Sequence, residues 1–514
     1  MPSTSQPEDA IWYCVRVRGA ADHAGWVRTG QLSELPALVG AGKGSVIEVC
    51  LTTDYRAVPP GRFRRVFCNR NRGLVGLEVT FRGETVRYAP LRMLTSNLRF
   101  RRVLELFARA RGVSIRDVME NGRFRAFSSR QLLLHVRTDS VSATELYRGG
   151  PLVLAGGRSS RERAEDLAAG ISSWMVRNQS ADGGLPYKYW PSRGTESPAD
   201  NAIRRFLACV ALARLGELRG SVELRDAARR NLRFNLRRYF RDLGDGRGAI
   251  VERTGAKLGA AALAGLAILE SRATGEFQSE FGMLAAGVDS LAGGKEGFRT
   301  FFFPPERNGS NWNFYSGEAL LFWAEAMRRD APFAPSPERV AEIFARCSER
   351  HRRARNPAFV PWHTQACALL FRQTGRREYA EFALEMSDWL LSMQQWDERP
   401  DLPLDLRGRF YDPRRPDFGP PHASSTAVYL EGLTDAIAIA REVGDATRAA
   451  AYRRAVERGL RSLRQLQFRD RNDAFYVSKA ARVMGALRTE AYDNAVRIDS
   501  AAHALAATVK FLKL

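Results

Sequence analysis

The sequence predicts a mainly α-helical protein, an (α/α)6 toroid of six helical hairpins preceded by a small α+β domain. Strand patterns occur only near the N-terminus, whereas the rest of the chain alternates six times between charged helical segments and apolar ones. A Gln that recurs near the ends of charged segments is the third observation. We therefore expect a basic α+β domain over 1–150, a linker over 151–161 and a toroid over 162–514.

Within the first domain, β-rich runs bounded by turn residues predict strands over 11–19, 46–52, 64–69, 74–81 and 84–91. An amphipathic helix is expected over 98–112, where Gly112 ends it. Shorter helices are expected over 114–121 and 127–136.

The net charge of +22 comes almost wholly from arginine, which supplies 72 of the 79 basic side chains. Residues 1–150 hold 24 Arg and Lys against 13 Asp and Glu, so half of the surplus lies in the first domain. A solvated basic face explains this surplus as well as an anion-binding surface does. No helix-turn-helix, zinc-finger or aromatic RNA-binding motif accompanies the charge, which disfavours nucleic acid as a partner.

Beyond residue 162, the second helix of each pair is apolar and rich in Ala, Leu and Gly, while the first is more charged. A helix that is apolar all round has to be enclosed, and one with a charged face lies outside it. The repeat therefore predicts a closed ring of inner helices surrounded by outer helices. The inner helices are expected to begin near Asp200, Lys257, Tyr315, Trp362, Ser424 and Arg497.

An apolar residue precedes a Gln by five positions near the ends of three outer helices, in Trp174…Gln179, Trp389…Gln394 and Leu460…Gln465. The apolar residue can pack inward while the amide binds backbone groups of the following loop. This pattern resembles the hairpin repeat of the α/α toroids: terpenoid cyclases, protein prenyltransferase β subunits, and six-hairpin glycosidases, polysaccharide lyases and uronyl epimerases. The resemblance covers about 162–514, implies the fold and leaves the chemistry open.

In such a toroid, the loops that lead into the inner helices share one rim around a funnel. These loops are rich in aromatic side chains beside Arg, Asn and carboxylates, which suits a sugar ring, although some rings will only anchor the loops. Cations at Lys188, Arg193 and Arg497 would suit an anionic group on that sugar. We expect substrate contacts from Tyr187, Lys188, Trp190, Arg193, Trp312, Asn313, Tyr315, Trp362, His363, Tyr492 and Arg497.

Acid–base catalysis is expected from Glu318 and His422, together with Glu196 or Asp499. Glu318 falls in the first turn of an inner helix, where a side chain can reach the funnel. His422 comes just before an inner helix of small residues, at the expected mouth of the funnel. Asp499 can equally serve as a helix N-cap, and His503, deeper in its helix, is expected to be a core histidine.

Metal and cofactor motifs are missing from the sequence. It contains no HExxH, no HxxxH and no Cys/His cluster, so no metal is expected, and it has no Gly-rich phosphate loop, so no cofactor is expected. Neither the Asp-rich motifs of terpenoid cyclization nor the zinc ligands of prenyltransferases occur. The six Cys are scattered, and neither a secretory signal nor a membrane span is apparent, so a cytoplasmic protein with reduced thiols is expected.

These features favour a carbohydrate-active enzyme, namely a glycoside hydrolase, lyase or epimerase, that acts on an anionic or uronate-containing saccharide. The first alternative is a non-catalytic scaffold protein that binds a glycan or polymer. The second is a prenyl- or terpenoid-type toroid enzyme, which the missing motifs disfavour. The rim, rather than the basic N-terminal domain, is the expected ligand site.

Overall fold

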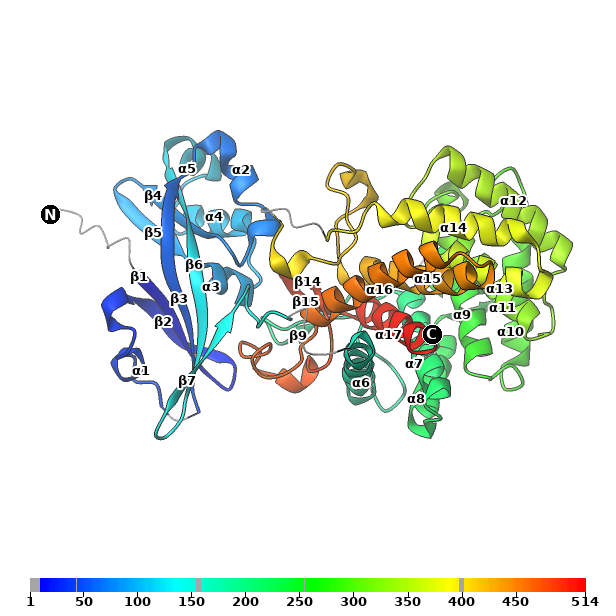
Figure 1. The fold of residues 1–514 in the computed structure, drawn as a ribbon, viewed down its shortest axis with the longest axis horizontal. Helices are drawn as coiled ribbons and strands as arrows, with labels where there is room; N and C mark the ends of the chain where they lie inside the picture. The colour runs from blue at the N-terminus through cyan, green and yellow to red at the C-terminus, as the bar shows by residue number, and fades with distance from the viewer. Residues whose placement is uncertain (1–9, 43, 154–158, 254, 397–401) are drawn as a thin grey trace.

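The computed structural model describes residues 10–42, 44–153, 159–253, 255–396 and 402–514. The molecule is elongated, with a β-sheet part at the N-terminal end and a helical part at the other end (Figure 1). The predicted linker over 151–161 falls partly outside the described residues, and the first helix of the helical part begins at Ser160. The mainly α-helical fold with a small α+β domain is therefore confirmed.

The N-terminal part is built on an antiparallel sheet, which within the described residues has seven strands in the order β2-β1-β3-β6-β4-β5, with β7 beside β6. Its strands are β1 (Ala10–Val17), β2 (Ala20–Arg28), β3 (Val46–Ala57), β4 (Gly76–Phe81), β5 (Glu84–Tyr88), β6 (Arg123–Val136) and β7 (Val141–Leu146). Its helices are α1 (Leu35–Leu38), α2 (Phe63–Val66), α3 (Pro90–Thr95), α4 (Phe100–Arg109) and α5 (Ile115–Asn121).

Two elements predicted for this part are wrong. Residues 127–136, predicted as a helix, continue strand β6, whose backbone pairs with β3 on one side and with β7 on the other. Residues 64–69, predicted as a strand, belong to α2 and the turn after it, where Phe63 and Phe67 pack against Phe124 and Phe100. In both segments, tertiary packing overrides the local preference of the sequence.

The helical part alternates between outer and inner helices over the described residues. The outer helices are α6 (Ser160–Asn178), α8 (Val222–Tyr239), α10 (Gln278–Ser290), α12 (Pro337–Arg353), α14 (Arg377–Leu391) and α16 (Ala446–Leu466). The inner helices are α7 (Ala202–Leu218), α9 (Leu258–Glu270), α11 (Trp312–Arg328), α13 (Val360–Thr374), α15 (Ala423–Glu442) and α17 (Ile498–Leu512). The loops carry short strands: β8 (Lys188–Trp190), β9 (Thr195–Glu196), β10 (Phe240–Asp242), β11 (Gly248–Glu252), β12 (Gly255–Lys257), β13 (Phe301–Phe303), β14 (Arg488–Glu490) and β15 (Asp493–Arg497).

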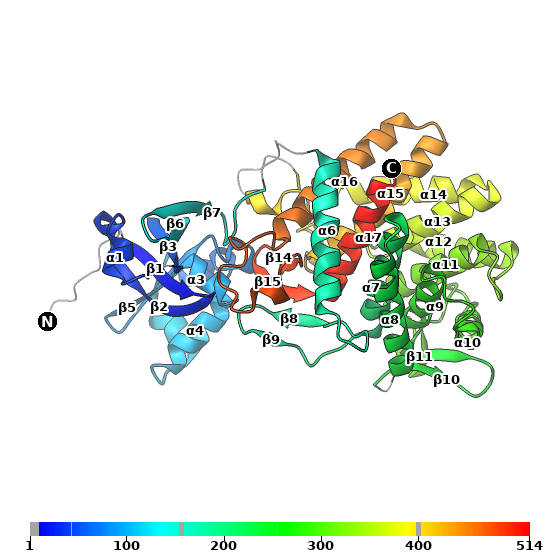
Figure 2. The ribbon, with the colours of Figure 1, turned by 90° about the horizontal axis from the view of Figure 1, so that it is seen from below.

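The inner helices form a closed ring. Each packs against the next from α7 through to α17, and α17 packs back against α7; Figure 2 shows α6, α17 and α7 side by side at this closure. Small residues allow the close approach: a Cβ at Gly265 of α9 would lie 2.5 Å from the ring of Phe322 on α11. The predicted (α/α)6 toroid fold is thus confirmed. Among the described helices, none has both the length and the apolar character to cross a membrane.

Glutamine side chains join neighbouring outer helices at the ends of three hairpins. The Gln179 amide donates to the carbonyl of Ala227 at 2.9 Å, and the Gln394 amide donates to the carbonyl of Ala455 at 2.8 Å. Each also donates to the carbonyl of a loop glycine, Gly183 at 3.3 Å and Gly408 at 3.1 Å. Both glycines have positive φ, and a Cβ on either would collide with the backbone of the next outer helix.

The third glutamine contact lies two residues beyond the predicted one. Gln467 donates to Leu167 of α6 at 3.3 Å and to Gly485 at 2.8 Å, and it thereby joins the last outer helix to the first. Gln465 instead accepts from the Val153 amide at 2.7 Å. The same type of contact therefore closes the outer layer, and it does so through a residue that the five-residue spacing did not select.

The sheet part packs directly on loops of the toroid. The buried Arg148 donates to the Asp405 carboxylate at 2.6 Å and to the carbonyl of Arg72 at 2.8 Å. Asn494 donates to the carbonyl of Leu94 at 3.1 Å. One apolar cluster runs from Trp12 of β1 into the toroid. Since this core is continuous, the division of the chain at residue 150 stays a prediction.

Replacing Gln467 with Ala should lower the free energy of unfolding by about 1–3 kcal/mol, because two buried carbonyls lose a donor at the closure of the outer layer. Chemical denaturation followed by circular dichroism measures the change. Gln278→Ala, at an exposed position on α10, is the control and should change stability by less than ~0.5 kcal/mol. Equal effects of the two substitutions would contradict this role of Gln467.

Candidate active site

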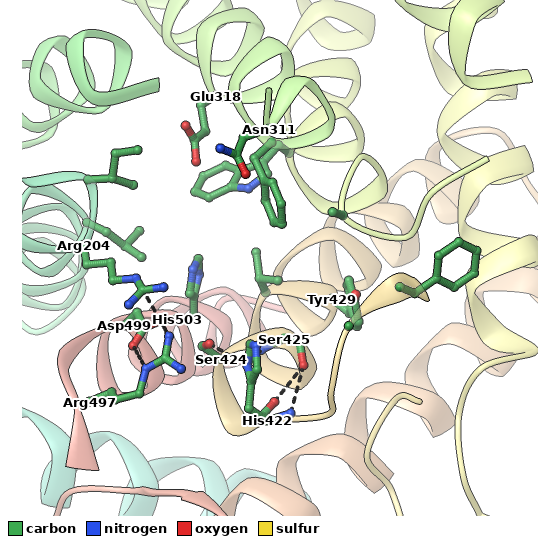
Figure 3. Close-up of a pocket in the computed structure, with 18 of the residues that line it drawn as sticks. Arg204, Asn311, Glu318, His422, Ser424, Ser425, Tyr429, Arg497, Asp499 and His503 are labelled. Atoms are coloured by element: carbon green, nitrogen blue, oxygen red, sulfur yellow. Dashed lines mark hydrogen bonds and ion pairs between the residues drawn. The ribbon is translucent and has the colours of Figure 1, made fainter. Parts of the chain in front are cut away.

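A cavity of about 490 Å³ lies at the mouth of the ring, and every inner helix or the loop entering it contributes to its lining. This volume is within the range of roughly 300–1,000 Å³ that small-molecule sites occupy. Figure 3 shows several of the lining side chains directed into the cavity. From the predicted site residues, the structure brings together Tyr315, Glu318, Trp362, His422, Arg497 and Asp499.

Glu318 is buried in the first half of α11. Among the described residues, its Oε2 has no hydrogen-bond partner. A Cβ at Gly259 of α9 would lie 1.9 Å from that oxygen, so the glycine makes room for the carboxyl group. Burial raises the pKa of Glu318 to about 8, and Lys257 lowers it in part. Glu318 is therefore mostly protonated at neutral pH and can donate a proton.

Asp499 lies in the first turn of α17, and Figure 3 shows it on the wall opposite Glu318. Arg497 donates to both carboxylate oxygens, at 3.0 and 2.5 Å, and Nε of Arg204 lies 3.2 Å from Oδ2. Burial alone would raise the pKa of Asp499, but Arg204 and Arg497 outweigh it and hold the pKa well below its usual value. Asp499 is thus ionised, and it fixes both guanidinium groups at the cavity wall.

His422 is the N-cap of α15 and points its side chain at the start of that helix. Its Nδ1 accepts from the backbone N–H of Ser425 at 3.0 Å and lies 2.8 Å from the Ser424 hydroxyl. Burial, followed by the effect of Arg497, lowers the pKa of His422 to about 4. The ring is therefore neutral at pH 7, and because Nδ1 is an acceptor, the hydrogen resides on Nε2.

His503 also lines the cavity, one helical turn beyond Asp499, and the sequence predicted it as a core residue. Its Nδ1 lies 2.7 Å from Oε1 of the buried Glu431 on α15. Because Glu431 occupies Nδ1, Nε2 is the ring nitrogen left for a ligand in the cavity. The edge of the ring meets Trp362, with centroids 5.7 Å apart. His503 is thus oriented as a proton acceptor.

Two half-buried carboxylates of the inner helices have cationic partners. Glu270 pairs with Arg214 at 2.7 Å and with Arg329 at 2.9 Å, and Asp435 pairs with Lys510. Paired charges of this kind fill the lumen further along the helices. Glu318 differs because its nearby cation, Lys257, contacts Glu252 at 3.0 Å instead. Within the described part of the chain, no group of three or more His, Cys, Asp or Glu is arranged to hold a metal ion.

The loop before α7 does not bring its predicted residues to the cavity. It forms β8 and β9, and β8 pairs with β15, so this loop extends a small sheet. Lys188 and Arg193 lie over the ring of Trp190, at 5.4 and 5.5 Å from its centre. Glu196 forms an ion pair with Arg482. None of these four predicted residues belongs to the lining of the cavity.

Two further predicted residues are buried in the wall. His363 lies with Nδ1 2.8 Å from the carbonyl of Phe359, and burial lowers its pKa to about 3. Trp312 is covered by the guanidinium of Arg350, 4.1 Å from the ring centre. Both side chains therefore support the rim loops and stay out of the cavity.

The remaining predicted contacts lie beside the cavity. The hydroxyl of Tyr187 accepts a hydrogen bond from Arg204, so it supports a cavity residue from behind. Tyr492 lies 6.0 Å from the Arg148 guanidinium, at the contact with the sheet part. Asn313 lines a neighbouring hollow of the rim.

Sequence reasoning missed several residues that line the cavity. His503 follows Asp499 by four positions, a spacing that places both on one helix face, and this was the available signal. Arg204 follows the N-cap Asn201 by three positions and faces the same way. The missed residues include Arg204, Lys257, Asn311 and His503.

No protein-family model and no curated protein matches the chain. Solved structures resemble it at low identity: an inactive variant of an α-1,6-mannanase from Salegentibacter sp. HEL1_6 has a TM-score of 0.49 and 12% identity, with 69% of this chain and 99% of that chain covered. An unsaturated glucuronyl hydrolase specific for heparin has a TM-score of 0.48 and 12% identity, with 69% of this chain and 97% of that chain covered. A sugar epimerase from a ruminal bacterium has a TM-score of 0.42 and 13% identity, with 57% of this chain and 85% of that chain covered. The likeness concerns the arrangement of helices, so the chemistry has to be argued from this chain's own residues.

Asp499→Asn should destabilise the protein by up to about 3 kcal/mol at pH 7, because it leaves two half-buried guanidinium groups without their carboxylate. The folded pKa of Asp499 is depressed, so its contribution is present above the unfolded value of ~3.9 and is lost as the pH falls below it. Thermal unfolding at several pH values should therefore show a difference from wild type that shrinks below about pH 4.

The control for this experiment is Asp417→Asn, which removes an exposed carboxylate 2.7 Å from Arg415. An exposed pair contributes at most ~1 kcal/mol, so this variant should unfold close to wild type at each pH. A difference for Asp499→Asn that stays constant from neutral to acid pH would contradict the ionised state of Asp499.

Proposed function

We propose that the protein is an acid–base enzyme of carbohydrate chemistry that acts on an anionic, uronate-type saccharide bound in the 490 Å³ cavity. One observation carries the proposal: two buried carboxyl groups, Glu318 and Asp499, share the cavity and have pKa values shifted in opposite directions. Pairs of titratable groups whose environments separate their pKa values are typical of acid–base sites. A buried carboxyl without a partner is also costly, which favours a functional role for Glu318.

In this proposal Glu318 is the general acid, because it enters the reaction carrying its proton. His503 is the general base: its Nε2 holds the free lone pair, and Glu431 stabilises the imidazolium that forms when the ring takes a proton. Nε2–H of His422 is a donor for a sugar hydroxyl. Asp499 positions the two arginines. His503 and Glu431 extend the residues that the sequence predicted for catalysis.

The preference for an anion follows from the side chains that line the cavity. Four of them are cationic, and two carboxylates oppose them: Asp499, which pairs with two of the cations, and Glu252, which contacts Lys257 from outside the lining. A cavity of this kind attracts a carboxylate, and guanidinium groups bind it with two parallel hydrogen bonds. Trp362 and Phe410 offer apolar surface for the sugar ring. The cationic lining residues are Arg204, Lys257, Arg307 and Arg497.

Hydrolysis, elimination and epimerisation each require one acid and one base placed around a sugar carbon, so all three fit these groups. Their products differ. Hydrolysis adds water to the mass, elimination creates an unsaturated sugar that absorbs ultraviolet light, and epimerisation in heavy water introduces deuterium at the inverted carbon. A binding scaffold would bind the saccharide and leave it unchanged.

The full chain should convert members of a panel of oligosaccharides from polygalacturonate, alginate, hyaluronan and heparosan, with products identified by mass spectrometry. Glu318→Gln should lower kcat by about 10²-fold or more, because the amide cannot donate the proton, while circular dichroism and saccharide binding remain. Glu306→Gln, exposed in the preceding loop, is the matched control and should keep full activity. Full activity of Glu318→Gln would remove it from the mechanism, and binding without conversion by the wild type would identify a scaffold.

A further inference from the structure

A second hollow, of about 310 Å³, adjoins the cavity on the rim. Its lining residues overlap with those of the cavity, so the two hollows share a wall. The shared wall comes from the start of α11 and from the loops before α13 and α15. The shared residues are Asn311, Phe314, Ala358, Phe418 and Gly419.

Phe314 exposes an aromatic ring at this junction. It lies in the first turn of α11, and 41% of its surface is accessible, although the other aromatic residues of α11 are buried. An exposed ring on a wall shared by two hollows is available to stack on the C–H face of a sugar. This position lets one ring contact two successive units of a saccharide chain.

Polar groups complete the second hollow. Asn313 and Asn356 offer amide groups that can both donate to and accept from hydroxyls. The charged groups of this hollow are paired: Arg350 with Glu296, and Asp417 with Arg415 at 2.7 Å. A unit bound here is thus recognised through hydroxyls and a ring face, in contrast to the cationic main cavity.

The walls are held in place before any ligand binds. On one side, the Asn308 side chain accepts from the backbone N–H of Thr300 at 2.7 Å, and the Thr300 hydroxyl accepts from the N–H of Gly309 at 2.8 Å. On the other side, the edge of Phe418 meets Trp389 with centroids 6.2 Å apart. Rigid walls reduce the entropy lost when a ligand is bound.

From this geometry we infer that the second hollow is a subsite for the next sugar unit of the same chain, so that the substrate is at least a disaccharide. The inference rests on the proposed function, since it assigns the first unit to the main cavity. The occupied cavity and the adjoining hollow would then hold two linked units, the charged one beside Arg204 and Arg497 and the next one against Phe314 and Asn313.

The test uses isothermal titration calorimetry of the full-length Glu318→Gln protein, which binds without converting the probe. The probes are glucuronic, galacturonic, mannuronic and guluronic acid, together with the di- and trisaccharides of the four polymers in the activity panel. For any polymer whose oligosaccharides bind, the di- and trisaccharides should bind at least tenfold more tightly than the single sugar from the same polymer.

Asn313→Ala should remove about a factor of five of that gain and leave the affinity for the single sugar unchanged, because Asn313 lines only the second hollow. Phe314→Ala should weaken oligosaccharide binding by roughly two- to twelvefold. The matched control, Phe333→Ala, removes another exposed ring beyond the far end of α11 and should bind like the parent.

Equal affinity for single sugars and oligosaccharides, or oligosaccharide binding that neither Asn313→Ala nor Phe314→Ala weakens, would overturn the subsite while the proposed function stands. Binding of no saccharide at all would overturn the proposed function and the subsite with it.

Discussion

Closure of the inner-helix ring is the constraint on which the rest of this structure depends. The ring closes because small residues let the inner helices approach, as at Gly265, and because α17 returns to pack on α7. The outer layer also closes, through the hydrogen bond that Gln467 at the end of α16 donates to α6. A closed ring encloses its lumen, so every polar side chain that faces inward must find a partner or change its protonation state.

The two carboxyl groups of the cavity show both outcomes. Asp499 lies between two guanidinium groups and stays ionised, whereas Glu318 faces Gly259 and retains its proton. The two carboxyl groups therefore differ in protonation because their neighbours on other inner helices differ, although both are carboxylic acids. Further along the inner helices, Glu270 is paired with Arg214, in contrast to Glu318 at the mouth.

The sequence was sufficient for the helical architecture because the periodic alternation of charged and apolar helices directly reflects burial. It also placed Glu318, His422, Asp499 and Arg497 at inner-helix starts, and these residues meet in the cavity. It could not show that the loop before α7 pairs with β15, because a short strand is stabilised by a partner far away in the chain. The place of His503 in the cavity could not be predicted for a similar reason, since its contact with Glu431 joins α17 to α15. The strand over 127–136 likewise depends on pairing with β3.

Burial in the closed ring keeps Glu318 protonated at neutral pH. Infrared difference spectra between the wild type and Glu318→Gln, recorded from pH 5 to pH 10, isolate the carboxyl band of this one residue. We expect a protonated-acid band that is present at pH 7 and disappears with a midpoint near pH 8. A carboxylate that is already ionised at pH 6, with a midpoint near the ordinary glutamate value of ~4.3, would contradict it.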